Sequence, residues 1–171
     1  MENQIERYAR LFRGLNRAYG ALDLTTTDAR GKQKGVYKFV HEPRTKATSE
    51  ILGKLKRLEI PLVVCRSKSG GAHLYLFFKE FIEAEKAQSK LKEVAAEIGY
   101  GGSEIFPKQI QLVLERGDNG NFLNLPYFNC ESGLRYAFND DGSAATLDEF
   151  LDKAEASAIT EAQLDSPLSK S

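Results

Sequence analysis

Hydrophobic positions along this chain switch between helical and strand spacing, which predicts a mixed fold of short helices and strands. Residues 2–16 carry one hydrophobic face at helical spacing, made by Ile5, Tyr8, Ala9, Phe12 and Leu15. Gly20 and the following Leu24–Gly35 segment, which is rich in Thr, Lys and Gly, predict a loop. Val36–Val40 predicts a short strand that ends before Pro43, because proline has no amide hydrogen to donate.

The middle of the chain predicts, in order, a helix, two strands, a helix and a strand. These elements cover residues 48–58, 60–66, 73–78, 84–98 and 104–106. Thr48 suits the N-cap of the first helix, and Gly99 suits the end of the second. Alternation over 73–78 puts Leu74, Leu76 and Phe78 on one face and His73, Tyr75 and Phe77 on the other.

After Pro107 the pattern predicts further short strands and one last helix. The strands are expected at Ile110–Leu114, Asn121–Leu125 and Leu134–Phe138, and turns at 116–120 and 139–142. A capping box at Thr146–Glu149 starts a helix that reaches Ala156. No linker divides the chain, so we expect one domain over residues 1–158, with an accessory part at 1–47 and a core at 48–158. The polar residues 159–171 predict a disordered tail.

Composition restricts the function classes without choosing one. The 171 residues are 42% hydrophobic and 28% charged with zero net charge, as in an ordinary soluble domain. This balance carries no global basic signature of a nucleic-acid binder, although a local basic patch is compatible with it. Cys65 and Cys130 stand far apart without metal-binding spacing, which favours reduced thiols and a cytoplasmic location. No apolar run is long enough to span a membrane, and the charges from Glu2 onward do not resemble a signal peptide.

Residues 66–73 concentrate polar chemistry between two predicted strands, with the sequence Arg66-Ser-Lys-Ser-Gly-Gly-Ala-His73. Backbone amides released by glycine, with hydroxyls and basic side chains beside them, suit phosphate oxygens. His73 can donate to the same anion. The alternative is an ordinary β-hairpin whose Gly70-Gly71 turn needs positive φ. The absence of a GxxxxGK[ST] pattern from the sequence excludes a P-loop ATPase.

Two further groups of residues are candidates for binding. The Glu104 carboxylate suits a divalent ion and the Lys108 ammonium suits a phosphate, with an edge strand bearing solvated charges as the alternative. Asn121 and Asn124 fall within a predicted strand, where asparagine is depleted. They either bind a ligand or base edge, or satisfy a local turn and a buried amide.

Three motifs, taken in this order, resemble the archaeo-eukaryotic primase superfamily. They are S-x-S-G-x-x-H before an apolar strand at 67–73, S-E-I-F-P-K-Q at 103–109 and G-N-x-x-N-L-P-Y-F at 120–128. The sequence is most similar to the primase–polymerase domain of TOTE conflict systems and of related phage and bacterial proteins, including its N-terminal helix at Arg7–Gly14. The resemblance spans residues 5–155. It implies an α+β fold with an RRM-like, split βαββαβ core and an N-terminal accessory unit.

The resemblance also implies template-directed nucleotidyl transfer with two divalent ions, Mg²⁺ or Mn²⁺. His73 and Glu104 would be the catalytic residues, with Glu104 also a metal ligand and Lys108 facing phosphate or template. The implied nucleotide-triphosphate site consists of Arg66, Ser67, Lys68, Ser69, Gly70, Gly71 and His73. The implied partners are a single-stranded template, nucleotide triphosphates, and helicase or nuclease proteins.

One motif of that family is missing here. Its metal-binding D-x-D pair lies on the strand before the first core helix, but Thr45–Glu50 runs directly into the helix and the chain contains no D-x-D. The hydrophobic pattern lacks the same strand, for which only Val36–Val40 is available, so the first core strand is missing or replaced. An internal deletion, a segment missing from this sequence and a catalytically inactive relative all stay open.

We therefore expect a primase–polymerase-type domain that binds nucleotide triphosphate and nucleic acid, with nucleotidyl transfer absent or impaired. The alternative is a non-catalytic nucleotide- or single-strand-binding module, in which Tyr75 and Phe77 stack bases if their face is open. A third interpretation is an RRM-like structural fold without a ligand, which is favoured if Arg66 and Lys68 point away from His73.

Overall fold

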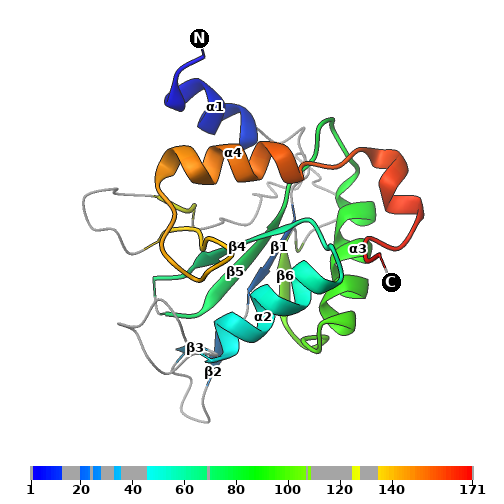
Figure 1. Ribbon diagram of the computed structural model, residues 1–171. Helices are drawn as coiled ribbons and strands as arrows, with labels where there is room; N and C mark the ends of the chain where they lie inside the picture. Colours follow the sequence, from blue (N-terminus) through cyan, green and yellow to red (C-terminus); the bar gives the residue numbers. More distant parts are fainter. Residues whose placement is uncertain are drawn as a thin grey trace, which may run out of the picture.

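A computed structural model shows a mixed α+β fold in which helices lie on both sides of a small sheet (Figure 1). The structure describes residues 2–12, 20–23, 25–27, 33–35, 46–68, 70–106, 108, 125–127 and 135–170. Its helices are α1 (Gln4–Leu11), α2 (Lys46–Arg57), α3 (Ala84–Glu97), α4 (Leu147–Ser157) and the 3₁₀ helix η3 (Glu161–Asp165). Its strands are β1 (Gly20–Asp23), β2 (Thr25–Thr27), β3 (Gln33–Gly35), β4 (Leu62–Arg66), β5 (Ala72–Leu76) and β6 (Glu104–Phe106).

Four strands form one antiparallel sheet in the order β4-β5-β1-β6. The strand β1 is central, because it pairs with β5 on one side and with β6 on the other. The chain reaches this arrangement by way of α2, which follows β1, and α3, which follows β5. Both helices cover the same face of the sheet, where the largest hydrophobic cluster lies.

The second face of the sheet is also covered, by α1 and α4 (Figure 1). Tyr75 and Phe77 follow one another on this face and pack against Leu11, Phe150 and Ala154. Their relative exposures are 0% and 1%. The alternation predicted for 73–78 is therefore confirmed, but the face that carries Tyr75 and Phe77 is not open for stacking bases.

The N-terminal half departs from the prediction at the strand before α2. Gly20–Asp23, in the region expected to be a loop, forms the central strand β1, and β2 and β3 form a separate antiparallel hairpin where the loop was expected to continue. Val36–Val40, the strand expected in this place, lies outside the described residues. The sequence signal for β1 is weak because four residues are too short to show a period, and partners on both sides stabilise the strand.

The helix boundaries follow the sequence signals closely with two exceptions. The helix predicted over residues 2–16 already ends at Leu11, with Phe12 as its C-cap. α4 begins after Thr146, which accepts a hydrogen bond from the Glu149 amide while the Glu149 carboxylate accepts one from the Thr146 amide. Gly99 ends α3 with a φ of 92°, a conformation that favours glycine. Thr48 is not an N-cap, since α2 already begins at Lys46 and Thr48 is buried within it, with 2% exposure.

A further chain segment extends the sheet beyond its four strands. Residues 136–138 run along the outer edge of β4, where the Arg66 amide donates to the Tyr136 carbonyl at 2.8 Å and the Phe138 amide donates to Val64 at 2.9 Å. The expected turn at 139–142 follows, closed by a bond from the Gly142 amide to the Asn139 carbonyl. This edge strand brings the segment before α4 close to the end of β4.

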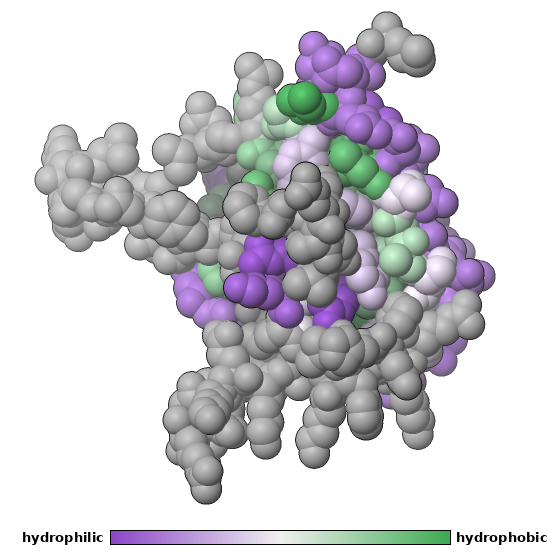
Figure 2. Space-filling view, turned by 90° about the vertical axis from the view of Figure 1, so that its left-hand side faces the viewer, coloured by the Kyte–Doolittle hydropathy of each residue, from purple (hydrophilic) through white to green (hydrophobic). Residues whose placement is uncertain are grey.

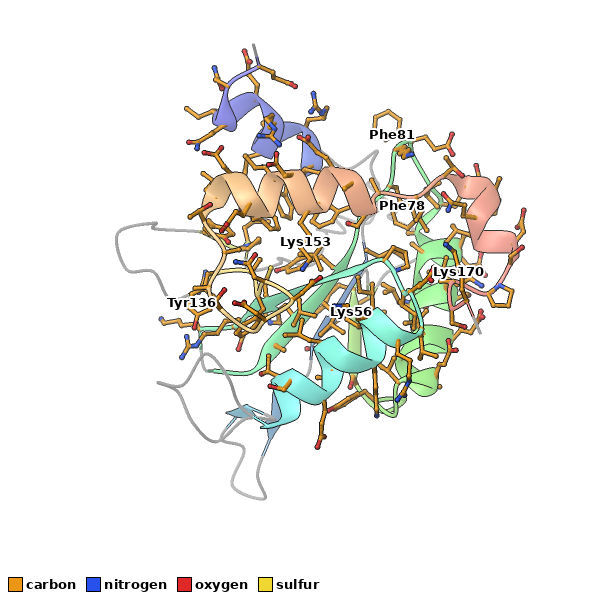
Figure 3. The ribbon with its side chains drawn as sticks, viewed as in Figure 1. Lys56, Phe78, Phe81, Tyr136, Lys153 and Lys170 are labelled. Atoms are coloured by element: carbon orange, nitrogen blue, oxygen red, sulfur yellow. The ribbon has the colours of Figure 1, made fainter. Side chains whose placement is uncertain are left out.

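Residues 159–170 pack against the domain, so the prediction of a disordered tail is wrong. Ile159 pairs with Phe78, and Leu164 and Leu168 are buried with 7% and 8% exposure. The Lys170 amide donates to the Leu58 carbonyl just after α2, and Figure 3 shows Lys170 on the side of the molecule where α3 lies. A polar composition concealed these two leucines, whose burial supplies the ordering free energy. In the part of the chain that the structure describes, no helix is long and apolar enough to span a membrane.

Candidate functional site

A tight hairpin turn joins β4 to β5 and contains the polar residues selected from the sequence. The Ser67 amide donates to the Gly71 carbonyl at 2.8 Å, and the Gly70 amide donates to the Ser67 carbonyl at 3.1 Å. Gly70 has a φ of 88°, which a residue with a Cβ rarely adopts. The hairpin is thus confirmed as the local structure, and any anion site must be built on it. Ser69 lies outside the described residues.

His73 follows this turn as the second residue of β5 and is nearly buried, with 9% exposure. The hydroxyl oxygen of Tyr75 lies 3.5 Å from its Nδ1 atom. The two rings meet edge to face, with centroids 6.2 Å apart and an interplanar angle of 80°. The imidazole therefore has a fixed aromatic neighbour on its own strand.

The strand register places His73 in a row that crosses the whole sheet. Cys65 on β4 and Asp23 on β1 are its direct partners, and Asp23 in turn is the partner of Glu104 on β6. The row thus reads Cys65, His73, Asp23, Glu104 from one edge of the sheet to the other. The carboxyl residue Asp23 therefore has the register position next to His73, although the sequence contains no D-x-D pair.

Cys65 is the member of this row that lies on the outer strand β4, and its side chain is fully buried. Burial raises the pKa of its thiol well above the ordinary value, so the sulfur stays protonated at neutral pH. A protonated, wholly enclosed thiol is a poor nucleophile and a poor metal ligand. Cys65 packs with Val63 and Ala137 as a small hydrophobic side chain.

The two charged residues expected at the third motif pair with each other. The Lys108 ammonium forms an ion pair with the Glu104 carboxylate, and it lies 5.0 Å from the centroid of the Phe106 ring. Both side chains are partly exposed, at 42% for Glu104 and 46% for Lys108. The pair therefore satisfies the two charges locally, and an incoming metal ion or phosphate would compete with this contact.

The basic residues of the turn are divided between different surroundings. Arg66 is the partner of Ala72 and follows Cys65 along β4, so strand alternation assigns it to the face opposite His73. Its Nη1 atom donates to the Ser67 carbonyl at 3.3 Å, and the residue is 5% exposed. Lys68 is exposed on the turn, while Ser67 is 3% exposed. Lys68 is thus the accessible cation of the turn, whereas Arg66 is buried and donates to the backbone of the turn.

The side chains that the structure describes do not assemble the two-metal centre implied by the resemblance. Among the residues whose side chains the structure describes, no group of three or more His, Cys, Asp or Glu side chains could hold a metal ion. Glu104 is neutralised by Lys108, and Asp23 adds one carboxyl residue to the row. Two divalent ions need several carboxylates, which this row does not provide.

Some residues at this end of the sheet were not selected from the sequence. Asp23 was overlooked because its strand was expected to be a loop, although the apolar Ala21-Leu22 pair before it was an available signal. Arg135 was overlooked because only the pairing of the next residue, Tyr136, with Arg66 brings this segment to the end of β4. Tyr75 was considered for base stacking and not as a neighbour of His73. Asn121 and Asn124 lie outside the described residues.

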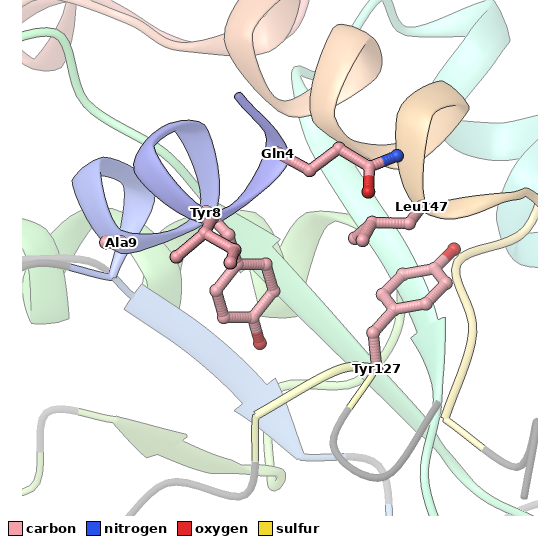
Figure 4. Close-up of a pocket in the computed structure, with 6 residues that line it drawn as sticks. Gln4, Tyr8, Ala9, Tyr127 and Leu147 are labelled. Atoms are coloured by element: carbon pink, nitrogen blue, oxygen red, sulfur yellow. The ribbon is translucent and has the colours of Figure 1, made fainter. Parts of the chain in front are cut away.

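A separate apolar pocket lies between α1 and the start of α4, away from the His73 turn. It has a volume of about 280 Å³ and is lined by Gln4, Ile5, Tyr8, Ala9, Tyr127 and Leu147 (Figure 4). Figure 2 shows the side of the molecule that lies on the left in Figure 1, and hydrophobic residues gather in its upper part. The two tyrosine hydroxyls donate to the Pro126 and Ala145 carbonyls. The pocket therefore offers a ligand mainly apolar surface, and its described lining contains no carboxyl, amino, guanidinium or imidazole group.

No protein-family model matches this chain, and no curated protein matches it. The functional interpretation rests on the turn, the row of residues and their contacts.

Proposed function

We propose that this chain is a nucleotide-binding domain of the primase–polymerase type, which holds nucleotide phosphates at the turn that leads to His73. In this proposal the domain retains the binding half of a nucleotidyltransferase site and performs nucleotidyl transfer weakly or not at all. A single-stranded template is the second ligand expected of such a domain.

The chain order of the sheet supports the architecture in this proposal. Apart from β2 and β3, which come between β1 and α2, the elements run in the order β1, α2, β4, β5, α3, β6, and the strands of the sheet lie in the order β4-β5-β1-β6. This is the order expected of an RRM-like, split βαββαβ unit, in which the first and third strands are central. In this interpretation Gly20–Asp23 replaces the missing first core strand.

The observation that carries the proposal is the position of His73, which lies between the glycine turn along the chain and the carboxyl residues Asp23 and Glu104 across the sheet. The imidazole lies two residues after Gly71 and has Asp23 as its register partner on the central strand. A donor beside a glycine-shaped turn suits the oxygens of a polyphosphate, and Lys68 adds an exposed positive charge. Neighbouring carboxyl residues are where a nucleotide-bound divalent ion would be accommodated.

The impaired activity in this proposal follows from the state of Glu104. Its carboxylate pairs with Lys108, and the described side chains include no cluster of three metal ligands. One divalent ion that arrives with the nucleotide requires fewer protein carboxylates than a two-metal centre, since the phosphates supply ligands themselves. Nucleotide binding is therefore compatible with this site, and efficient transfer is not.

The single-strand-binding alternative loses its specific support. It depended on an open face around Tyr75 and Phe77, and both side chains are enclosed by α1 and α4. The hypothesis of a fold without a ligand gains support from the position of Arg66, because this residue belongs to the face opposite His73. Lys68 and His73 are the two residues that separate this hypothesis from the proposed function.

Isothermal titration calorimetry with ATP and dATP in the presence of Mg²⁺ tests the binding. We expect His73→Ala to weaken binding about 10- to 100-fold, the range for losing one charge-assisted hydrogen bond. Lys68→Ala should weaken it several-fold, while Lys92→Ala removes an exposed lysine from α3 as a matched control and should leave it unchanged. Equal affinity in the wild type and His73→Ala would overturn the proposed binding site.

A primer-extension assay with Mg²⁺ or Mn²⁺ tests the second half of the proposal. We expect little or no product from the wild-type chain at protein concentrations where nucleotide binding is complete. Robust synthesis that is lost in both Asp23→Asn and Glu104→Gln would show that this row does support catalysis, and would refute the impaired-transfer claim. Robust synthesis by purified protein that survives both substitutions would refute the impaired-transfer claim as well, and would place catalysis outside this row.

A further inference from the structure

We propose that the apolar pocket between α1 and the start of α4 binds a short basic segment of a partner protein, which inserts one or two large apolar side chains. The pocket lies away from the His73 turn and shares none of its residues. This inference therefore goes beyond the proposed function and does not depend on it.

The size and lining of the pocket indicate which groups can enter it. Its volume is about 280 Å³, and Ile5, one of its lining residues, is 80% exposed. An apolar cavity of about 150 Å³ holds a benzene ring, so this pocket accommodates one or two side chains of leucine or phenylalanine size. Cofactor sites direct several polar groups at their ligand, whereas both tyrosine hydroxyls of this lining donate to backbone carbonyls.

The aromatic walls of the pocket are held in place by the core. Figure 4 shows the rings of Tyr8 and Tyr127 on two sides of the space. Both rings contact Phe150, with centroid distances of 6.4 Å and 5.1 Å. A pocket whose walls are already packed loses little conformational entropy when a side chain enters it.

The backbone of Tyr127 is a second indication of a binding site. Its φ of 55° lies in the left-handed region, which is uncommon for a residue with a Cβ. The Tyr127 amide donates to the Arg135 carbonyl at 2.7 Å, and the Ala137 amide donates to the Tyr127 hydroxyl at 3.0 Å. Backbone conformations of this kind persist where the surroundings hold them, and they cluster at ligand-binding sites.

The two segments that supply most of the lining carry an excess of negative charge. Residues 2–12, which contain α1, and residues 139–157, which contain α4, include eight carboxyl residues and three basic residues. All three basic residues form ion pairs with carboxylates of these same segments. Exposed carboxylates are ionised at neutral pH, so the surroundings of the pocket attract cations and repel anions.

Asp148 brings this charge to the pocket itself. It follows the lining residue Leu147, and its side chain is 64% exposed. A partner lysine or arginine beside an apolar side chain in the pocket can therefore pair with Asp148. Single-stranded nucleic acid requires basic residues beside its stacking rings, and this acidic surface repels phosphates. Charge complementarity thus favours a protein segment in which lysine or arginine flanks leucine or phenylalanine.

Methyl NMR of the wild-type protein tests the site without any substitution. The probe is the synthetic peptide K-K-L-F-K-K, and the peptides K-K-A-A-K-K and E-E-L-F-E-E are its controls. We expect the probe to shift the methyl signals of Ile5 and Leu147 and to leave those of Leu91, which packs in the core on the other face of the sheet, unchanged. Each control peptide should bind at least about tenfold more weakly, since it lacks either the apolar anchor or the charge.

Calorimetry with the same probe tests the pocket through substitutions that open no cavity. Ala9 is an exposed lining residue on α1, so Ala9→Leu fills the pocket from the helix surface. We expect Ala9→Leu to weaken binding at least about tenfold, while Ala96→Leu, at an exposed position on α3, is the matched control and should leave it unchanged. Asp148→Asn should weaken binding about two- to fivefold, as for the loss of one exposed ion pair.

Unchanged methyl signals of Ile5 and Leu147, or equal affinity of the wild type and Ala9→Leu, would overturn the proposal. Tighter binding of E-E-L-F-E-E or of an oligothymidylate would also overturn it, and would assign the pocket to an acidic partner or to single-stranded nucleic acid. A dimer of the free protein that Ala9→Leu dissociates in sedimentation would assign the pocket to a second copy of this chain. Probe binding that persists in His73→Ala would support a site separate from the nucleotide site.

Discussion

Replacing Phe77 tests whether the face of β5 that carries His73 and Tyr75 is enclosed. Phe77 is 1% exposed, and its ring centroid lies 5.7 Å from that of Phe12, 6.0 Å from Tyr75 and 6.2 Å from Phe150. Truncating such a side chain to alanine costs about 3–5 kcal/mol, because a cavity replaces the ring. That loss is comparable to the whole stability of a small domain, so the milder Phe77→Leu, at about 1–2 kcal/mol, is the measurable change.

The assay is urea unfolding of the wild type, Phe77→Leu and the control Phe81→Leu, followed by circular dichroism. Phe81 lies on the loop between β5 and α3 with 62% exposure, and Figure 3 shows its side chain pointing away from the domain. We expect the unfolding free energy of Phe81→Leu to stay within about 0.5 kcal/mol of the wild type. The midpoint of Phe77→Leu should fall without a change in the slope of the transition.

Equal stability of the two variants would refute the reasoning. It would mean that α1 and α4 do not cover this face, and that Tyr75 and Phe77 are accessible after all. The base-stacking interpretation of these residues would then regain its support.

Two further predictions concern other contacts of the domain. Arg7 joins α1 to α4 through hydrogen bonds of 2.9 Å to Glu155 and 2.6 Å to Asp152. The bond to Glu155 lowers the pKa of that carboxyl group. Its contribution to stability is therefore complete above the ordinary Glu pKa of about 4.3 and is lost as the pH falls through the lowered value. We expect the melting temperature of Arg7→Gln to fall less steeply than that of the wild type between pH 5 and pH 3, and parallel profiles would contradict this. Leu164→Ala should lower the unfolding free energy by about 2 kcal/mol, since Leu164 is buried in the α2–α3 layer, and an unchanged midpoint in urea would mean that the C-terminal residues do not contribute to the core.

The sequence predicted those parts of the fold whose signals are local. The capping box at Thr146, the glycine that ends α3 and the alternation along β5 each depend on residues within one turn or one strand. β1 could not be predicted in this way, because its four residues are defined by partners fifty or more positions away on β5 and more than eighty positions away on β6. Leu164 and Leu168 were likewise concealed by polar neighbours, and their burial depends on the distant α2 and α3.

The candidate site shows the same division between local and distant information. The glycine turn and His73 were visible as one continuous motif, and the structure keeps them together. The pairing of Lys108 with Glu104 was not visible, because each charge was assigned separately to a ligand when the two residues stand four positions apart at the end of one strand. Arg66 was expected to converge with His73, but strand alternation after Cys65 assigns it to the other face.

The central position of β1 connects the fold to the chemistry of the site. A strand must stand between β5 and β6, because both would otherwise have an unpaired edge in the middle of the sheet. The segment between α1 and α2 supplies that strand, and its register places Asp23 beside His73 and Glu104. The sheet therefore has its central strand without a D-x-D pair, and the register row across it contains two carboxyl residues, Asp23 and Glu104. Because the sheet needs a central strand, the chain keeps β1 and with it the nucleotide-binding geometry that we propose. The two carboxyl residues of the row are too few for the two-metal chemistry that the resemblance implies.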